Sequence, residues 1–212
     1  MGGTAPFGRG RVRRLFGLDR SAPPPRQTRA GEPLNPWTIP NLVGYVRLAA
    51  IPVFLVLAYG TEDGTSVLSA MVFWAIAAGD YLDGILARIT GQYSRMGALL
   101  DPLVDRLTIL AGAVVCWDFS LLPRWALALL ALREVAMLFL AQYGLRHGVD
   151  IEVNWPGRIS VFPIMGGIWL ALIAPGWVAS ALVIWGLAMA IVATVLYARS
   201  GMRAVHAAKA AS

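Results

Sequence analysis

Two long apolar segments joined by a short polar loop decide the fold, and residues 65–117 read TSVLSAMVFWAIAAGDYLDGILARITGQYSRMGALLDPLVDRLTILAGAVVCW. Residues 65–89 and 97–117 are each long enough to cross about 30 Å of hydrocarbon as an α-helix. Four aspartates nevertheless lie inside them, namely Asp80, Asp83, Asp101 and Asp105. An ionisable side chain at membrane depth is costly, so by default it marks a function or a partner. The segment therefore predicts a polar site within a helical membrane protein.

The composition of the whole chain favours the same class of protein. Of its 212 residues, 58% are hydrophobic and 14% are charged, and the mean hydropathy is +0.63. A soluble domain carries roughly a quarter charged residues, and one of this length has too small an interior to hide so much apolar surface. The single cysteine, Cys116, excludes a disulfide framework and a cysteine-ligated zinc site. Any chemistry must rest on carboxylates, arginines and the backbone.

Apolar segments of membrane-spanning length recur along the chain after Pro40. We expect an all-α, six-transmembrane-helix bundle with helices at residues 41–59, 65–89, 97–117, 122–145, 157–174 and 177–198. We expect a basic cytoplasmic tail at residues 1–36, the membrane domain at residues 37–200 and a short cytoplasmic tail at residues 201–212. The first tail either only sets orientation or carries a short interfacial helix attracted to anionic headgroups.

The basic residues indicate the orientation. The net charge is +6, and seven of the arginines fall in the first 30 residues. Further basic residues gather at the ends of the expected helices on the same side, whereas Glu62, Asp63 and Asp118 lie on the opposite side. The positive-inside rule then puts both termini and the aspartates on the cytoplasmic side of the cell membrane. The expected partner is the lipid bilayer, and no nucleic acid is expected.

The four aspartates are spaced to converge. Asp80 and Asp83 share one face of their helix, as Asp101 and Asp105 do on the next, because residues three to four apart lie on one face. The two helices are antiparallel around a short loop, so all four carboxylates lie at similar depth. Such a cluster either is partly protonated or is neutralised by divalent metal. All-oxygen ligands favour Mg²⁺ or Mn²⁺, and two ions bridged by shared carboxylates suit phosphoryl transfer.

The full pattern from Asp80 to Asp105 is D-x2-D-G-x2-A-R-x8-G-x3-D-x3-D. It resembles, with no element missing, the signature of the CDP-alcohol phosphotransferase (CDP-alcohol phosphatidyltransferase) family, whose members have six helices with the motif on the second and third. The resemblance implies that Asp80, Asp83 and Asp101 hold the metals. It also implies that Asp105 completes the metal site and is the catalytic base that removes the proton of the acceptor hydroxyl.

The resemblance further implies the reaction and its substrate contacts. An alcohol would attack the lipid-bearing phosphate of CDP-diacylglycerol and release CMP, in an enzyme that is a homodimer. The residues implied in CDP-diacylglycerol binding are Asn41, Gly44, Gly84, Ala87, Arg88 and Ser94. Gly44 stands where the family usually has Thr or Ser, so the sequence departs from the pattern there.

The acceptor is the least determined part of this reading. Sequences around Ile39 and Ile51 look like the phosphatidylglycerophosphate synthase and bacterial CDP-alcohol-type cardiolipin synthase branch. The corresponding acceptors, glycerol 3-phosphate and phosphatidylglycerol, both carry a phosphate that arginine binds well. Arg47, Arg133 and Arg158 are the candidates for this contact. Glycerol 3-phosphate is the main reading and phosphatidylglycerol is the alternative.

Other readings of the same residues stay open at this stage. Arg47, Arg133 and Glu134 could equally form intramembrane ion pairs that hold helices together. The aspartates could serve a divalent-cation or proton transporter, which would leave Gly84, Ala87 and Arg88 without a role. A catalytically silent paralogue with a scaffolding role is the third hypothesis, and Gly44 motivates it.

Overall fold

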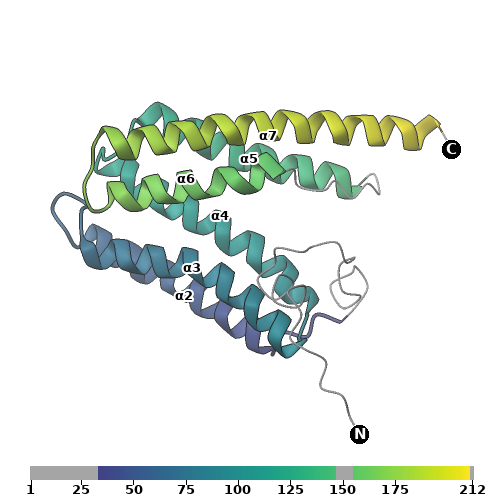
Figure 1. Cartoon of the computed structure of the whole chain (residues 1–212), viewed down its shortest axis with the longest axis horizontal. Helices are drawn as coiled ribbons and strands as arrows, with labels where there is room; N and C mark the ends of the chain where they lie inside the picture. The colour runs from purple at the N-terminus through teal and green to yellow at the C-terminus, as the bar shows by residue number, and fades with distance from the viewer. Residues whose placement is uncertain (1–32, 147–154, 211–212) are drawn as a thin grey trace, which may run out of the picture. The chain divides into compact units, whose positions relative to one another are not determined.

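The computed structural model describes residues 33–146 and 155–210, and the regular structure of these ranges is entirely helical (Figure 1). It comprises six helices, α2 (Ile39–Tyr59), α3 (Val67–Thr90), α4 (Arg95–Asp118), α5 (Arg124–Arg146), α6 (Trp155–Ala171) and α7 (Trp177–Ala210). The all-α class and the six helices are confirmed for this part of the chain. The expected interfacial helix of the first tail lies outside the described residues.

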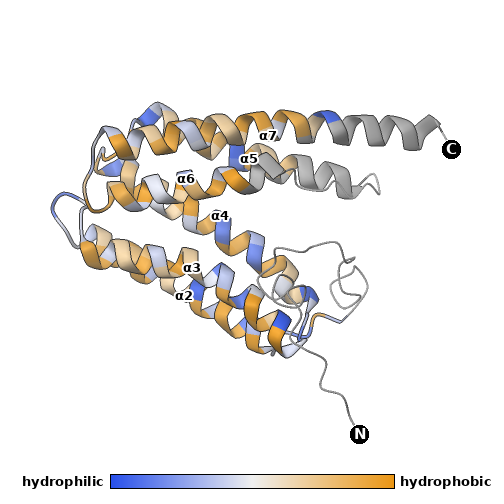
Figure 2. Cartoon of the chain, in the orientation of Figure 1, coloured by the Kyte–Doolittle hydropathy of each residue, from blue (hydrophilic) through white to orange (hydrophobic). Residues whose placement is uncertain are grey.

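Three of these helices are long and apolar enough to cross a membrane, namely α2, α3 and the Trp177–Leu196 part of α7. Large apolar side chains are exposed on all six helices, for example Val56 on α2, Trp74 on α3 and Phe162 on α6. In Figure 2 most of the coloured helical ribbon carries the orange of hydrophobic residues. A soluble protein rarely exposes apolar surface on this scale, so the structure fits a protein that is embedded in lipid.

The last helix is longer than the sequence predicts. Helix α7 continues to Ala210, so it runs past the expected end at residue 198 and through the expected domain boundary at residue 200. The segment after Leu196 is too polar to extend a membrane span, but it is rich in alanine and has no proline. Alanine has the highest helix propensity, so the helix persists where the apolar pattern ends.

Serine caps fix where α3 and α4 begin. The hydroxyl oxygen of Ser66 accepts hydrogen bonds from the amides of Leu68 (3.2 Å) and Ser69 (3.4 Å), at the start of α3. Ser94 Oγ accepts a hydrogen bond from the Gly97 amide (2.9 Å) at the start of α4. Between the two helices Gly91 has a φ of +67°, the left-handed conformation that commonly ends a helix. The turn from α3 to α4 is therefore tight.

Two compact units divide the chain. Within the described residues, one unit contains the chain up to Val53 together with Trp74–Thr108, and the other contains Phe54–Phe73 and the chain from Ile109 onward. The first unit contains all four motif aspartates. In the second unit α7 packs against α5 and α6, and the buried Cys116 belongs to its core.

Candidate active site

The four motif aspartates differ in how far they are open to the surroundings. Asp83 on α3 is buried, with 3% of its surface exposed. The Asp80 side chain is 49% exposed and the Asp105 side chain on α4 is 34% exposed. Asp101 lies one helical turn before Asp105 and is partly exposed. Asp80 is therefore the most exposed of the four, Asp101 and Asp105 are intermediate, and Asp83 is buried.

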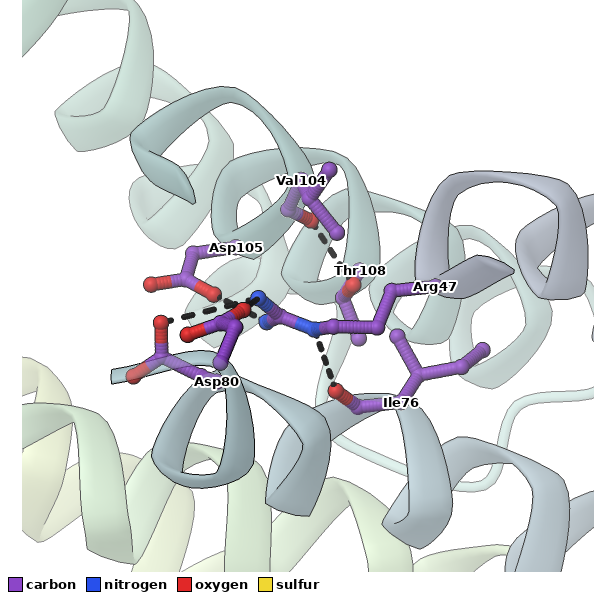
Figure 3. Close-up of polar contacts among 7 residues, drawn as sticks. Arg47, Ile76, Asp80, Val104, Asp105 and Thr108 are labelled. Carbon is purple, nitrogen blue, oxygen red and sulfur yellow. Dashed lines mark hydrogen bonds and ion pairs between the residues drawn. The ribbon is translucent and has the colours of Figure 1, made fainter. Parts of the chain in front are cut away.

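The cation among these carboxylates is Arg47 of α2 (Figure 3). Its Nη1 donates a hydrogen bond to Asp83 Oδ2 at 2.9 Å and lies 3.6 Å from Asp80 Oδ1. Its Nη2 donates to Asp105 Oδ1 at 2.6 Å. Arg47 is 3% exposed, and its charge-assisted contact with the buried Asp83 is shielded from solvent, whereas Asp80 and Asp105 are partly exposed. One guanidinium thus joins α2 to both aspartate-bearing helices.

The backbone of α3 holds Arg47 in this position through contacts that the sequence alone does not predict. Arg47 Nε donates a hydrogen bond to the carbonyl oxygen of Ile76 at 2.9 Å. A Cβ at Gly79 would lie 2.7 Å from Arg47 Cδ and 2.8 Å from Cγ, so only glycine leaves room for the side chain. Gly79 lies one helical turn before Asp83 and shares its face, and that spacing is the signal that could have revealed it.

Two residues predicted to bind CDP-diacylglycerol, Asn41 and Ser94, contact one another. The hydroxyl of Ser94 donates to Asn41 Oδ1 at 2.9 Å, and both residues are buried. The side-chain Nδ2 of Asn41 donates to the backbone carbonyl oxygens of Asn35 (3.1 Å) and Pro36 (3.0 Å). A Cβ at Gly97 would lie 2.7 Å from Asn41 Oδ1, which explains the motif glycine there. These residues fasten the start of α4 to the start of α2.

The remaining predicted nucleotide contacts lie on two helices, with Gly44 on α2 and Gly84, Ala87 and Arg88 on α3. A Cβ at Gly44 would lie only 2.5 Å from Leu100 Cδ2, so Leu100 fills the space that a Thr or Ser side chain would need. On α3 the guanidinium of Arg88 lies 3.4 Å from the position of a Gly84 Cβ, so it lies against the glycine one turn earlier. Ala87, also on α3, is partly exposed. A side chain at position 44 would therefore require Leu100 to shift.

The two other candidate acceptor arginines lie in the second unit. Arg133 on α5 forms an ion pair with Glu134, and its Nε donates to Thr194 Oγ1 on α7 at 3.2 Å. The ion pair considered as the alternative for Arg133 is present, but it lies within α5, and it is the hydrogen bond to Thr194 that joins α5 to α7. Arg158 lies near the start of α6, and its side chain is outside the described part of the structure.

The oxygen donors of the four aspartates are those that a divalent cation prefers, but their side chains are not arranged as a metal cage. Mg²⁺ and Mn²⁺ prefer carboxylate oxygens, and four carboxylates on two adjacent helix faces supply them. Across the described ranges, however, no three acidic, histidine or cysteine side chains are grouped as a ready-made metal cage. The carboxylates of Asp80, Asp83 and Asp105 are instead arranged around the guanidinium of Arg47. The donor set fits a hard cation, and Arg47 is the cation already present.

Comparison with known proteins shows the family of this chain. The family model of the CDP-alcohol phosphatidyltransferases matches residues 37–196, which include α2, α3, α4 and all four aspartates. The chain belongs to the CDP-alcohol phosphatidyltransferase family, as its aspartate motif predicts. It is therefore a transferase of phospholipid biosynthesis and a membrane protein.

Its relatives carry the names of two activities. The chain is 37% identical over 171 residues to a CMP-forming cardiolipin synthase of Streptomyces coelicolor, covering 78% of this chain and 80% of the relative. It is 31% identical over 184 residues to a CDP-diacylglycerol–glycerol-3-phosphate 3-phosphatidyltransferase of Salmonella typhimurium, covering 82% and 96%. A probable phosphatidylglycerophosphate synthase of Mycobacterium tuberculosis is 34% identical over 127 residues, covering 58% and 59%. Both branches named from the sequence are represented.

Proposed function

We propose that this protein transfers the phosphatidyl group of CDP-diacylglycerol to a hydroxyl of glycerol 3-phosphate, forming phosphatidylglycerophosphate and releasing CMP. The observation that carries the proposal is the convergence of Asp80, Asp83 and Asp105 on one point between α2, α3 and α4, in a chain of this family. The relative of Salmonella typhimurium, which is matched over 96% of its length, supports glycerol 3-phosphate as the acceptor.

The reaction needs one proton to move and one phosphorus–oxygen bond to be exchanged. The acceptor oxygen attacks the lipid-bearing phosphorus, the bond from that phosphorus to the CMP oxygen breaks, and the acceptor proton goes to Asp105. Arg47 Nη2 holds Oδ1 of Asp105 at 2.6 Å, which leaves Oδ2 to accept the proton. The partial exposure of the Asp105 side chain gives a water-soluble acceptor access to it.

A divalent metal, Mg²⁺ or Mn²⁺ and in our proposal two ions, belongs to this site. Asp80, Asp83, Asp101 and Asp105 would hold it, and it would supply positive charge that offsets the charge of the diphosphate. Because Gly84 and Ala87 have small side chains, the nucleotide can approach the backbone of α3 closely. Arg88 supplies a guanidinium for a phosphate. Asn41 and Ser94 support the nucleotide site by fixing the start of α4.

The proposal also places the protein in the cell membrane. All six helices form the transmembrane bundle, with both termini and the aspartates on the cytoplasmic side of the cell membrane. The basic first tail lies at that surface, where arginines meet anionic headgroups. Family resemblance supports a homodimer. Acyl chains of CDP-diacylglycerol would stay in lipid while glycerol 3-phosphate enters from the cytoplasm.

A second candidate acceptor is phosphatidylglycerol, which would make the protein a cardiolipin synthase. The cardiolipin synthase of Streptomyces coelicolor, 37% identical to this chain, favours it. The pairing of Arg133 with Glu134 is compatible with either acceptor, because an arginine in an ion pair still has free donor directions for a phosphate.

One incubation series tests both candidates. Purified protein is given CDP-diacylglycerol, Mg²⁺ and one acceptor at a time: glycerol 3-phosphate, phosphatidylglycerol, inositol phosphate or serine. CMP release is measured and the lipid product is identified by mass spectrometry. Phosphatidylglycerophosphate supports the main proposal and cardiolipin supports the alternative. Binding of CDP-diacylglycerol without CMP release from any acceptor would instead indicate a silent paralogue, and cation flux into liposomes without nucleotide would indicate a transporter.

A further inference from the structure

Arg47 is held more firmly than a residue that waits for a substrate phosphate would be. All three of its guanidinium nitrogens have protein partners: Nε bonds the Ile76 carbonyl, Nη1 bonds Asp83 and Nη2 bonds Asp105. The side chain is almost completely buried, and Gly79 leaves a space that its Cδ and Cγ fill. A phosphate of the acceptor would have to share the guanidinium with these carboxylates. These contacts show Arg47 engaged with the aspartates, and its contact with an acceptor phosphate stays a prediction.

Its position gives Arg47 a different relation to the proposed metal. A cluster of carboxylates in a low-dielectric setting needs positive charge close by, because like charges at short range repel strongly. The oxygens that Arg47 contacts, Oδ1 of Asp80, Oδ2 of Asp83 and Oδ1 of Asp105, are also ligands available to a metal. A divalent cation that uses these oxygens competes with the guanidinium for them.

We propose that Arg47 is a positioning residue that acts as the internal counter-cation of the aspartate cluster. It keeps Asp83 and Asp105 together when no metal is bound, and it weakens metal binding by occupying the same oxygens. This inference rests on the proposed metal site but is tested by metal binding without any substrate. Removing the charge should destabilise the metal-free protein and make divalent cations bind more tightly.

The test compares wild-type protein with Arg47→Met, which keeps an apolar side chain but loses the charge. Each protein is purified in detergent with EDTA and then titrated with Mn²⁺, and free Mn²⁺ is measured by electron paramagnetic resonance. We expect Arg47→Met to bind Mn²⁺ at least ~10-fold more tightly than wild type, because a competing unit charge within contact distance is gone. Its thermal unfolding temperature should be lower than that of wild type in EDTA and should rise more on addition of Mn²⁺.

Arg133→Met is the matched control, because Arg133 is also a largely buried arginine with a carboxylate partner, Glu134. It should unfold at a lower temperature with and without Mn²⁺ and should leave the Mn²⁺ affinity unchanged. Gly79→Ala is the second variant and keeps every charge. The new Cβ would lie 2.7 Å from Arg47 Cδ, so the guanidinium has to shift. Its Mn²⁺ affinity should lie between those of wild type and Arg47→Met, which keeps the test decisive where Arg47→Met does not fold.

The possible outcomes separate this inference from the proposed function. Mn²⁺ affinity that is equal or weaker in both Arg47→Met and Gly79→Ala would overturn the counter-cation role and leave the metal-dependent transferase intact. Failure of wild type and both variants to bind Mn²⁺ would overturn the proposed metal site as well. Tighter binding in Arg133→Met as in Arg47→Met would show a general effect of removing a buried arginine, and would also overturn the inference.

Discussion

Ser94 donates a hydrogen bond of 2.9 Å to Oδ1 of Asn41, and this contact ties the first turn of α4 to the first turn of α2. The two residues are 53 positions apart in the chain. Because Ser94 caps the helix that carries Asp101 and Asp105, the contact helps to fix the position of these aspartates relative to α2. A residue pair that sequence resemblance assigns to nucleotide binding thus also has a structural task.

Replacement of Asn41 should therefore lower stability as well as activity. Asn41→Ala removes the donors to two backbone carbonyls and the acceptor for Ser94, which are buried groups. We expect a loss of about 1–3 kcal/mol in the free energy of unfolding, measured by denaturant unfolding in detergent. Leu42→Ala is the control, because Leu42 is exposed on the neighbouring position of α2. An Asn41→Ala variant as stable as wild type would show that these bonds carry no structural role.

The close approach of Gly44 and Leu100 predicts that the two positions are coupled. Gly44→Ser should destabilise by about 1–3 kcal/mol, because its Cβ would meet Leu100 Cδ2 at 2.5 Å. Leu100→Ala should destabilise by about 2–5 kcal/mol, because it opens a cavity at a buried position. The double variant should be more stable than the sum of the single effects implies, in a double-mutant cycle of unfolding free energies. Strict additivity would contradict the steric explanation for Gly44.

Asp105→Asn should remove most of the turnover while leaving the fold intact. An asparagine oxygen can still accept the hydrogen bond from Arg47 Nη2, but the amide cannot take the acceptor proton. CMP release should fall by roughly 10²–10⁴-fold, the range that general-base removal produces. The unfolding temperature, measured in parallel, should stay close to that of wild type. Asp118→Asn, in the second unit, is the control and should keep its activity.

Full turnover by Asp105→Asn would show that another group accepts the proton. The proposed reaction would then stand on the other three aspartates, and the assignment of the base would be wrong.

The loop between α2 and α3 predicts a small, acid-sensitive contribution to stability. Asp63 accepts hydrogen bonds from the hydroxyl (2.7 Å) and the amide (2.9 Å) of Thr65, and these bonds lower the pKa of Asp63 below its ordinary value of 3.8. A lowered pKa in the folded state means that the ionised form stabilises the fold at higher pH. This contribution is present above about pH 4 and is lost as the pH falls through the lowered pKa.

Thermal unfolding of Asp63→Asn against wild type checks this expectation. Wild type should be the more stable protein at pH 7, and the difference should vanish as the carboxyl becomes protonated below about pH 4. Glu62→Gln is the control, since Glu62 lies on the same loop and takes no part in the two bonds to Thr65. A difference between Asp63→Asn and wild type that is independent of pH would contradict the role of the charge.

The features that the sequence predicts, namely the helices and the aspartate motif, depend on residues that are close together in the chain. Apolar runs locate the helices, and the regular spacing of Asp80, Asp83, Asp101 and Asp105 places them on facing sides of α3 and α4. Family membership follows from the same motif. Each of these inferences needs only helix geometry and residue type.

The parts that the sequence does not predict depend on contacts between distant segments. Nothing near Arg47 in the chain indicates that its side chain is directed at Asp83, 36 positions away. The roles of Gly79 and Leu100 appear only when α3 and α4 pack beside α2. The end of α7 was missed for another reason, because an apolar pattern marks where a membrane ends and an alanine-rich segment stays helical beyond it.

The burial of Cys116 makes the native chain a ready background for labelling experiments. It is the sole thiol among the 212 residues, and it is enclosed in the core of the second unit. A buried thiol is shielded from polar maleimides, so single cysteines can be introduced into the loops without first removing it. Reaction of intact cells with a membrane-impermeant maleimide at position 62, and protection of position 92, would then report which side each loop faces.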